Sequence, residues 1–213
     1  RYLPSPLDVP AIQGVDPANG RAVQRQPEPG SSLCALVFKI VMEPHAGRLA
    51  YTRIYSGDIQ AGKAIYNASR KHRERAQRLL QVQANKYTEL SEAQAGDIVA
   101  IVGFKETTTG DTLSEPDHEI ILEAIDFPDP VIKVAVEPRS MAEQDKLADA
   151  LSKLSEEDPT FRREVDGQTG QTIISGMGEL HLEIIRNKLI RDMKVNVETG
   201  KPRVSYREAI TKK

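Results

Sequence analysis

The period of the hydrophobic pattern changes once along the chain, at residues 124–130, where Pro128 and Pro130 enclose Asp129. Before this segment, apolar and polar residues alternate in short runs separated by turn signals, which is the two-residue period of half-buried strands. After it, two stretches place apolar residues three and four positions apart, the period of amphipathic helices. Proline interrupts both kinds of structure, so the segment predicts a boundary between two domains, residues 1–125 and 126–199. Residues 200–213 are predicted to begin a further, truncated domain.

Residues 1–125 are predicted to form a linker followed by an antiparallel β-barrel. Leu80, Val82 and Ala84 alternate with glutamines, as one buried face of a strand requires. Several such runs, with turn signals between them and no amphipathic helix, are typical of a closed antiparallel barrel. Residues 12–30, rich in proline, glycine and polar residues, are predicted to be an irregular entry to it. The other strand-like runs are residues 36–42, 47–55, 64–67, 98–102 and 120–122.

Residues 126–199 follow the order β-α-β-β-α-β, which is the ferredoxin-like α+β arrangement. The first helix is predicted to begin at a capping box formed by Ser140 and Glu143 and to end before Pro159. The two helices of this domain would cover one face of a four-stranded sheet and leave the other face free for partners. The predicted strands are residues 131–136, 160–165 and 171–175 and a last strand marked by Val195 and Val197, with a hairpin loop at 166–170. The apolar stripes are Leu147, Leu151 and Leu154 on the first helix, and Leu182, Ile185, Leu189 and Met193, widened by Leu180 and Ile184, on the second, at residues 178–192.

The composition limits the class of protein only broadly. The 29 basic and 31 acidic residues leave a formal net charge of -2, so global charge neither supports nor excludes a nucleic-acid partner. The single cysteine, Cys34, permits no internal disulfide, suits a reducing compartment and is predicted to be a small buried hydrophobe. No apolar run approaches the ~18 residues of a membrane span and no leader is visible, so we expect a soluble, cytoplasmic, monomeric chain without membrane contact. Arg1 in place of methionine, and a strand-like run at 203–210 with nothing after it to pair with, suggest part of a larger protein.

The sequence indicates no catalytic or metal site. Residues 57–63 match the phosphate-binding spacing G-x-x-x-x-G-K, but Ala64 stands where a serine or threonine would hold magnesium. A strand-like run follows this segment, whereas a phosphate loop must lead into a helix. None of the four histidines occurs in a ligand spacing. A free-standing nucleotide-binding enzyme built on residues 57–63 is therefore only a minor alternative.

Two surfaces are candidates for binding partners. The basic run at residues 70–78 could neutralise the phosphates of a nucleic acid or could be an ordinary solvated face, and its lack of aromatic residues argues against base stacking there. His181, Ile185 and Lys188 share one face of the second predicted helix, beside its core stripe. That face is either a half-buried helix surface or a docking face, and the glycine-rich turn before it would permit close backbone approach.

Several motifs resemble one family of translation factors. Residues 170–184 (GQTIISGMGELHLEI) strongly resemble the third domain of bacterial elongation factor G, as does the helix-to-strand junction at 156–161 (EEDPTF). In the predicted barrel, residues 47–49 (GRL), 53–57 (RIYSG) and 109–113 (TGDTL) resemble the second domain of that family. Residues 2–8 and 201–208 resemble the segments that leave the first domain and enter the fourth. The resemblance covers essentially the whole chain.

This resemblance implies a non-catalytic, ribosome-docking and signal-transmitting segment of a five-domain translational GTPase that drives GTP-dependent movement of tRNA and mRNA. GTP and Mg2+ would bind the first domain of the parent protein, and this chain would hold neither. A ribosome-protection protein that removes tetracycline, or an organellar or paralogous elongation factor G, is the alternative.

The resemblance also implies which partners each domain has. The barrel would dock on small-subunit ribosomal RNA and ribosomal proteins, and the second domain would pack against the GTPase domain and later domains of the same chain, at a junction where the family binds fusidic acid. Many members have arginine at the position of Lys188, which lacks the planar fork of arginine. The implied ribosome-facing residues are Arg48, Arg53, Arg70, Lys71, Arg73 and Arg75. The residues implied to face the GTPase domain are Thr172, Gly176, Gly178, Glu179, His181, Ile185 and Lys188.

Overall fold

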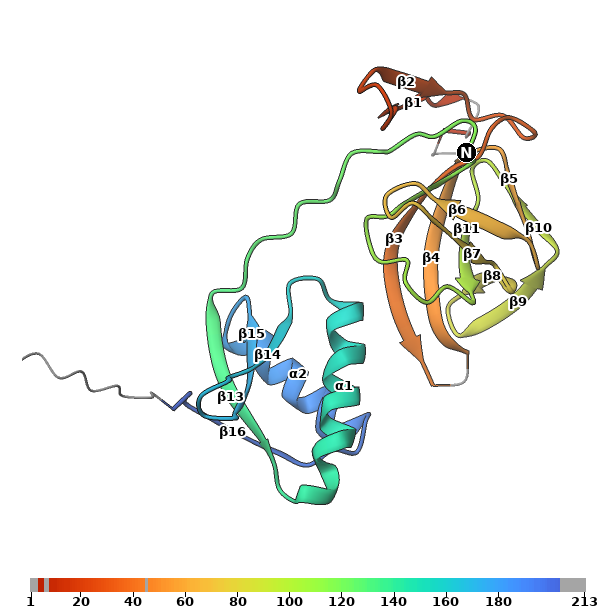
Figure 1. Ribbon diagram of the computed structural model, residues 1–213. Coiled ribbons are helices and arrows are strands. Elements are labelled where there is room, and N and C mark those ends of the chain that lie inside the picture. Colours follow the sequence, from red (N-terminus) through yellow and green to blue (C-terminus); the bar gives the residue numbers. More distant parts are fainter. Residues whose placement is uncertain (1–3, 6–7, 45, 204–213) are drawn as a thin grey trace, which may run out of the picture. The chain divides into compact units, whose positions relative to one another are not determined.

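The computed structural model describes residues 4–5, 8–44 and 46–203 of the 213-residue chain. It separates into two compact units, residues 1–126 and 127–213, a division that falls inside the proline-flanked segment (Figure 1). Residues 122–131 contain neither helix nor strand. Most of the segment predicted to begin a further domain, from residue 204 onwards, lies outside the described residues.

The first unit is a β-barrel-like domain built on one curled antiparallel sheet of eight strands, in the order β7-β6-β12-β3-β4-β11-β8-β9 (Figure 1). Its concave side encloses the main core, which includes Ile40, Ile54, Ile101 and Leu113. Among the described strands no hydrogen-bonded pairing joins β7 to β9, so side-chain packing rather than a continuous ladder completes the predicted barrel. The strands are β3 (Cys34–Glu43), β4 (Gly47–Ser56), β6 (Ala64–Asn67), β7 (His72–Arg75), β8 (Arg78–Gln83), β9 (Lys86–Leu90), β11 (Ile98–Val102) and β12 (Thr112–Ser114), with a separate pair of β5 (Asp58–Gln60) and β10 (Glu92–Gln94).

The predicted strand with Leu80, Val82 and Ala84 on one buried face is only partly correct. Strand β8 ends at Gln83, and Ala84 lies in the following turn with φ 51°. Leu79 and Leu80 are both buried, because each side of this sheet carries an apolar cluster. The run at 120–122 is also not a strand: Ile121 makes a single bridge to Val15.

Residues 12–30 contain a hairpin where an irregular entry was predicted, so that prediction was wrong. Strands β1 (Ile12–Val15) and β2 (Ala22–Arg25) pair antiparallel. The Asp16 carboxylate accepts a hydrogen bond from the Ala18 amide at 2.8 Å, and Gly20 closes the turn with φ 69°. Ile12 and Val23 pack on a small cluster that contains Ile120, Leu122 and Cys34. The hairpin is therefore stabilised by contacts with residues about a hundred positions away, which local composition does not reveal.

Cys34 is fully buried in that cluster, as predicted. Burial raises the pKa of its thiol to about 12, although the nearby Arg25 charge opposes this effect. A thiol that stays protonated and enclosed behaves as a small hydrophobe.

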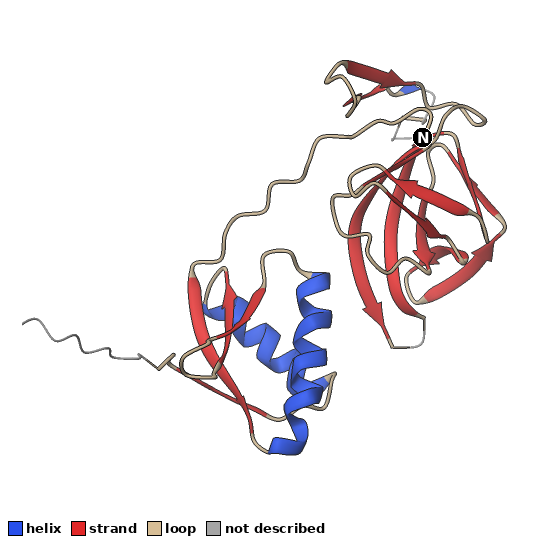
Figure 2. Cartoon of the chain, viewed as in Figure 1, coloured by secondary structure: helices blue, strands red, loops and turns tan. Residues whose placement is uncertain are grey.

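The second unit is a four-stranded antiparallel sheet, β14-β15-β13-β16, with both helices on one face (Figure 2). The element order is β-α-β-β-α-β, which confirms the predicted ferredoxin-like fold. Phe161, Leu151, Ile174 and Leu189 are buried between the helices and the sheet. The elements are β13 (Ile132–Pro138), α1 (Gln144–Glu157), β14 (Arg162–Val165), β15 (Thr172–Gly176), α2 (Glu179–Arg191) and β16 (Val197–Gly200). Among the described residues, no helix is long and apolar enough to span a membrane.

The predicted capping box is not formed. A 3-10 turn at Met141–Glu143 precedes α1, and the Ser140 hydroxyl lies 3.4 Å from the Glu143 carboxylate instead of accepting from the backbone. The other end of α1 is as predicted: Asp158 is extended, with φ -127° and ψ 102°, because Pro159 disfavours helical geometry in the residue before it.

The core stripe of α2 is narrower than predicted. Leu182, Ile185 and Leu189 are buried, as the spacing required. Leu180 and Ile184, which were predicted to widen the stripe, are 70% and 48% exposed. Each lies two positions from Leu182, which is about 200° around the helix and therefore on the opposite side.

Candidate functional site

The basic run at residues 70–78, predicted as a candidate surface, forms the turn before β7, strand β7 itself and the first residue of β8. Arg73 and Arg75 are exposed, whereas His72 and Glu74, on the other side of the strand, are half-buried. Lys71 lies in the turn from β6 with φ 57°. The run is thus a β-strand whose two faces carry different charges, and the strand was missed because neither face is apolar.

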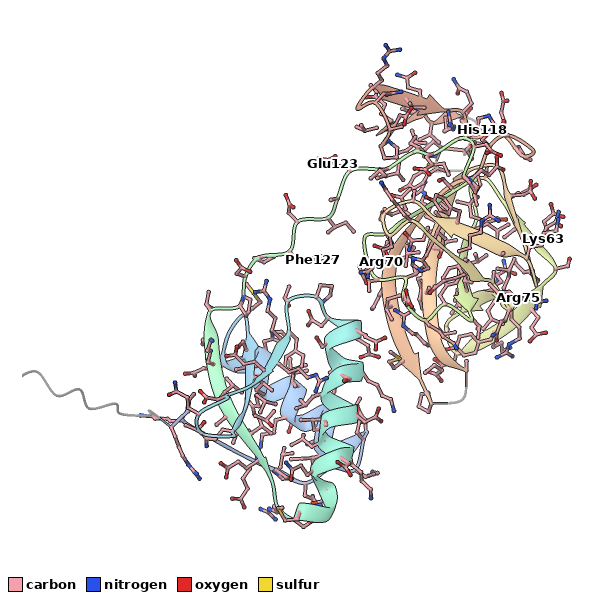
Figure 3. The ribbon with its side chains drawn as sticks, in the orientation of Figure 1. Lys63, Arg70, Arg75, His118, Glu123 and Phe127 are labelled. Atoms are coloured by element: carbon pink, nitrogen blue, oxygen red, sulfur yellow. The ribbon has the colours of Figure 1, made fainter. Side chains whose placement is uncertain are left out.

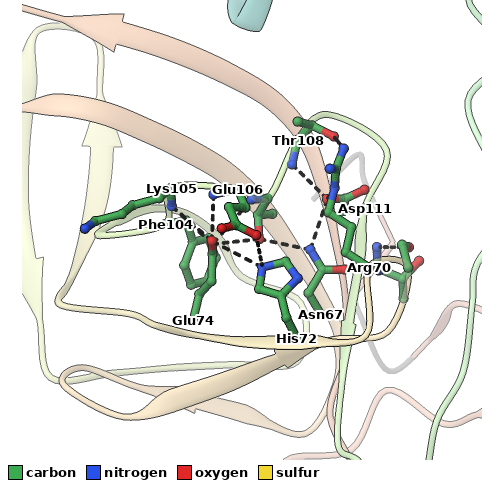
Figure 4. A network of polar contacts seen from close by, with 12 residues as sticks. Asn67, Arg70, His72, Glu74, Phe104, Lys105, Glu106, Thr108 and Asp111 are labelled. Atoms are coloured by element: carbon green, nitrogen blue, oxygen red, sulfur yellow. Dashed lines mark hydrogen bonds and ion pairs between the residues drawn. The ribbon is translucent and has the colours of Figure 1, made fainter.

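The half-buried Glu74 side chain holds the loop at residues 104–111 (Figure 4). Its carboxylate accepts hydrogen bonds from the backbone amides of Lys105 at 3.2 Å, Glu106 at 2.6 Å and Thr107 at 3.4 Å, and from the Thr107 hydroxyl at 2.9 Å. His72 Nε2 lies 3.3 Å from the same carboxylate. Burial raises the pKa of Glu74, but these hydrogen bonds outweigh it and the net pKa is lowered. The loop amides form an anion-binding nest that Glu74 occupies.

The other end of the loop is held by Asp111. Its carboxylate accepts from Asn67 Nδ2 at 3.0 Å, Arg70 Nε at 2.8 Å and the Thr108 amide at 2.8 Å. Asn67 is almost fully buried and also donates to the Thr107 hydroxyl at 2.9 Å. Arg70 therefore binds the loop as well as carrying charge to the surface (Figure 4).

Arg48 holds the same loop through its carbonyl groups. The guanidinium donates to the carbonyl oxygen of Phe104 at 3.1 Å and to that of Thr107. Carboxylates thus bind the loop amides and a guanidinium binds its carbonyls, so the backbone of residues 104–111 is fixed from several directions. Glu74, Asp111 and Asn67 were not among the predicted site residues, because their partners lie 31 to 44 positions away along the chain.

The six predicted ribosome-facing cations do not form one patch. Arg48 and Arg70 bind the loop at 104–111, and Arg75 donates from Nε to the Gly62 carbonyl oxygen at 2.7 Å. Arg53 lies on β4, with its guanidinium carbon 5.2 Å from the centroid of the Tyr55 ring. Figure 3 shows Arg70 and Arg75 at different sides of the barrel-like domain.

Lys71 and Arg73 are exposed, and the described residues provide neither of their side chains with a hydrogen bond, an ion pair or a ring contact, unlike Arg53 and Arg75. Lys71 lines an open hollow of about 510 Å³ together with Arg25 and His118, and the carboxylates of Asp16, Asp117 and Glu119 line it as well. Arg73 lines a second hollow, of about 370 Å³, together with Lys63, Tyr66, Asp58 and Glu115. Because no described residue binds their side chains, Lys71 and Arg73 are the most available of the six to an external anion.

In the second unit, His181 fixes the turn between β15 and α2. Its Nδ1 accepts a hydrogen bond from the Met177 amide at 3.1 Å, and its Nε2 lies 3.0 Å from the Asp158 carboxylate. Since Nδ1 is an acceptor, the ring proton belongs on Nε2, facing Asp158. Burial raises the pKa of Asp158, but hydrogen bonds from Thr160 and the nearby His181 lower it overall. His181 thus connects the start of α2 to the end of α1.

The other residues predicted to face the GTPase domain differ in how accessible they are. Ile185 is buried in the core between the helices and the sheet, and Lys188 Nζ lies 3.3 Å from the Glu157 carboxylate of α1, so both have partners within the unit. At Gly176 a Cβ atom would lie 2.7 Å from Leu182 Cδ2 and 3.0 Å from His181 Nδ1, so a larger residue would displace these side chains, whereas Gly178 has an extended φ of 177° and open space around it. Thr172 is half-buried and Glu179 is exposed.

The segment with phosphate-loop spacing does not fit a nucleotide. Residues 58–60 form β5, and Ala64 begins strand β6 rather than a helix. The Gly62 amide donates to the Ala76 carbonyl oxygen at 2.6 Å, and Gly57 packs against residues 31–33 in a turn with φ 72°. Helix N-terminal amides that would bind a phosphate are therefore not provided. Among the described residues no group of three or more His, Cys, Asp or Glu side chains is placed to hold a metal ion.

Comparison with known proteins gives matches in both units. The family described as elongation factor G domain 2 matches residues 32–116, and elongation factor G domain III matches residues 127–201. Elongation factor G 2 of Syntrophomonas wolfei is 52% identical over 212 residues, and elongation factor G of Dehalococcoides mccartyi is 52% identical over 210. The matches cover 100% and 99% of this chain, which spans 30% of the length of each relative. A crystal structure of a Thermus thermophilus protein is similar with a TM-score of 0.69 and 30% identity, covering 82% of this chain and 26% of that one.

Proposed function

This chain belongs to the elongation factor G family, over its second and third domains, and from this premise we propose that it is the non-catalytic, ribosome-docking part of a translational GTPase. The barrel-like domain binds the RNA of the small ribosomal subunit, and the α+β domain transmits the state of the GTPase domain. GTP and Mg2+ bind elsewhere in the parent protein, which acts in the cytoplasm during the translocation of tRNA and mRNA. The names of the relatives favour an elongation factor over a ribosome-protection protein. Since one relative is an elongation factor G 2, a paralogous elongation factor G remains an alternative.

The RNA-binding part of the proposal rests on one observation: the hairpin that bears the exposed cations Lys71 and Arg73 is held firmly by hydrogen bonds. The hairpin that bears them is fastened to the loop at 104–111 by Glu74 and Asp111. A hairpin whose backbone is already fixed loses little backbone entropy when its cations bind phosphates, and such contacts position a protein on RNA without reading its sequence.

Replacing both Lys71 and Arg73 by glutamine is expected to weaken binding of the chain to purified small ribosomal subunits roughly tenfold at moderate salt. The dependence of log Kd on log salt should become shallower by about 1.4 for single-stranded RNA or about 1.8 for an RNA duplex, because two phosphate contacts are lost. Co-sedimentation at several salt concentrations measures both quantities. The matched control, Lys146→Gln with Lys153→Gln, removes the same charge from α1 and should leave binding near that of the unchanged chain. Equal affinities and slopes for all three proteins would rule out this hairpin as the docking surface.

The second part of the proposal concerns the face of α2 that contacts α1. Lys188 forms an ion pair with Glu157 at 3.3 Å, and His181 connects the turn before α2 to Asp158. A domain pressing on this face would compete for Lys188 and thereby alter the contact between the two helices. This arrangement supports the expectation that residues 176–188 relay the state of the GTPase domain.

Within the whole factor, Lys188→Gln is expected to lower ribosome-stimulated GTP turnover about fivefold, within the range of typical coupling energies. Glu157→Gln is the matched control, because it breaks the same ion pair but leaves the cation on α2. If Lys188 serves only to hold α1, the two variants will have equal turnover, and the relay would then have to be abandoned.

A further inference from the structure

The convex face of the barrel sheet carries a second apolar cluster. Leu49, Leu80 and Ala100 are almost completely buried there, with Val82 and Tyr51 packed around them. Alternate residues of the same strands, such as Ile54 and Ile101, face the main core. The outer face of an antiparallel sheet is usually polar, so the side chains that cover this buried cluster are of interest.

Three aromatic side chains lie over this cluster. The register between β3 and β4 shifts between Val37 and Lys39, which makes Phe38 a bulge residue, and its ring is 37% exposed. The Phe38 and Tyr51 rings meet edge to face, with centroids 6.3 Å apart. Tyr87 pairs with Val82 across β8 and β9 and is 39% exposed. Burial raises the pKa of Tyr51, and the nearby Tyr87 and the Glu43 carboxylate raise it further.

Two exposed cations, Lys39 and Arg53, lie on the strands that carry Phe38 and Tyr51, and the Arg53 guanidinium lies over the ring of Tyr55. Lys39 pairs with Tyr51 across β3 and β4, and Arg53 pairs with Ile98, which is 52% exposed. On β8 and β9, Arg78 and Glu89 form an ion pair at 3.1 Å, so the positive charge of Arg78 already neutralises the Glu89 carboxylate. The face therefore presents flat rings together with positive charge, which complements an anionic partner with flat groups of its own.

We propose that this outer aromatic face, formed by Phe38, Tyr51, Tyr87, Lys39 and Arg53, binds unpaired nucleotides of RNA. The bases stack on the three rings and the phosphates bind the two cations, as on other sheet platforms that hold single strands. The proposal rests on the proposed function in that ribosomal RNA supplies the nucleotides. It adds a surface distinct from the cationic hairpin, since its residues lie on β3, β4 and β9, whereas Lys71 and Arg73 lie in the turn after β6 and on β7.

The test uses the full chain and a fluorescein-labelled, 12-nucleotide single strand of uridines, with anisotropy as the readout. Phe38→Leu with Tyr87→Leu keeps the face apolar and should weaken binding about a hundredfold, or about tenfold for each ring, with an unchanged salt slope. Lys39→Gln with Arg53→Gln should instead make the salt slope shallower by about 1.4, the value for two phosphates of a single strand. Leu180→Ala, an exposed apolar residue of the second unit, should change neither. Thermal unfolding confirms that each variant is folded.

Unchanged binding of the oligonucleotide by the double-leucine variant, or no binding by the unaltered chain, overturns the proposal. Co-sedimentation with small ribosomal subunits distinguishes failure of this proposal from failure of the proposed function. If only the Lys71 and Arg73 variant loses the subunit, the proposed function stands and this face is not used. If the oligonucleotide binds in a ring-dependent way but the subunit does not bind, the face is supported and the proposed docking fails. Ring-dependent binding of the subunit without binding of the oligonucleotide would indicate a ribosomal protein as partner and would also overturn the RNA assignment.

Discussion

Ile185→Ala is expected to lower the free energy of unfolding of the second unit by about 2–4 kcal/mol. The side chain is buried between the helices and the sheet, and its loss leaves a cavity that the surrounding core cannot fill. The two described α-helices both lie in this unit, so ellipticity at 222 nm during urea unfolding reports on it.

Leu180→Ala is the control for Ile185→Ala. It shortens an apolar side chain of the same helix, but one that is 70% exposed, so the change should stay within about 0.5 kcal/mol. An equally small effect at Ile185 would show that the core assignment of this residue is wrong. If the large effect is found, any loss of translocation in an Ile185 variant must first be attributed to weaker folding, and not to a lost contact with the GTPase domain.

Glu74→Ala is expected to destabilise the barrel-like domain by about 2 kcal/mol, and Glu74→Gln by about half as much. Alanine leaves the amides of Lys105, Glu106 and Thr107 without their acceptor, whereas glutamine retains one carbonyl oxygen. Of the six tyrosines of the chain only Tyr206 belongs to the second unit, so tyrosine fluorescence mainly follows the unfolding of the barrel-like domain.

The contribution of Glu74 should depend on pH in a definite direction. The pKa of its carboxyl is lowered in the folded state, so its stabilisation is fully present above the unfolded pKa of about 4.3. It is lost as the pH falls through the lower folded pKa, because the protonated carboxyl is a weaker acceptor. The difference in unfolding midpoint between the unaltered chain and Glu74→Gln should therefore shrink in acid.

Glu106→Gln is the matched control for Glu74. It removes the same charge from a side chain that lies 3.8 Å from His72 in the same network but is largely exposed. Its effect should stay within about 0.5 kcal/mol. If the two glutamine variants unfold alike at every pH, Glu74 does not hold the loop at 104–111.

Most of the fold of the second unit was predictable from local patterns. The stripe of Leu147, Leu151 and Leu154 identified α1, and Asp158 before Pro159 located its end. The hairpin between β14 and β15 was predicted from an aspartate-to-glycine loop, in which Asp166 accepts from the amides of Gln168 and Thr169.

The same kind of loop, from Asp16 to Gly20, was missed because the strands on either side are short and weakly apolar. Ile12 and Val23 pack on Ile120 and Leu122, and these contacts cannot be read from composition. The two short strands have little apolar surface of their own, so the hairpin depends on surface supplied by a distant segment.

The candidate site was predicted less well than the fold. The basic residues were recognised, and the resemblance of the motifs identified the family. The roles that the structure gives to several of these side chains differ, however, from the predicted ones. Arg48 and Arg70 hold a loop, and Ile185 is part of a core. The rings of the outer aromatic face lie on three different strands, which only strand pairing brings together.

The amino-acid sequence alone determined the division into two domains, the helices and most of the long strands, because burial on one face is recorded in the local spacing of apolar residues. The tertiary structure decided which charged groups are available to a partner. Glu74 meets Glu106 across 32 positions and Arg48 meets Phe104 across 56, and contacts of this range depend on how strands pair. A charged side chain has no periodic signature, so whether it supports a loop or faces a ligand is settled only when distant segments meet.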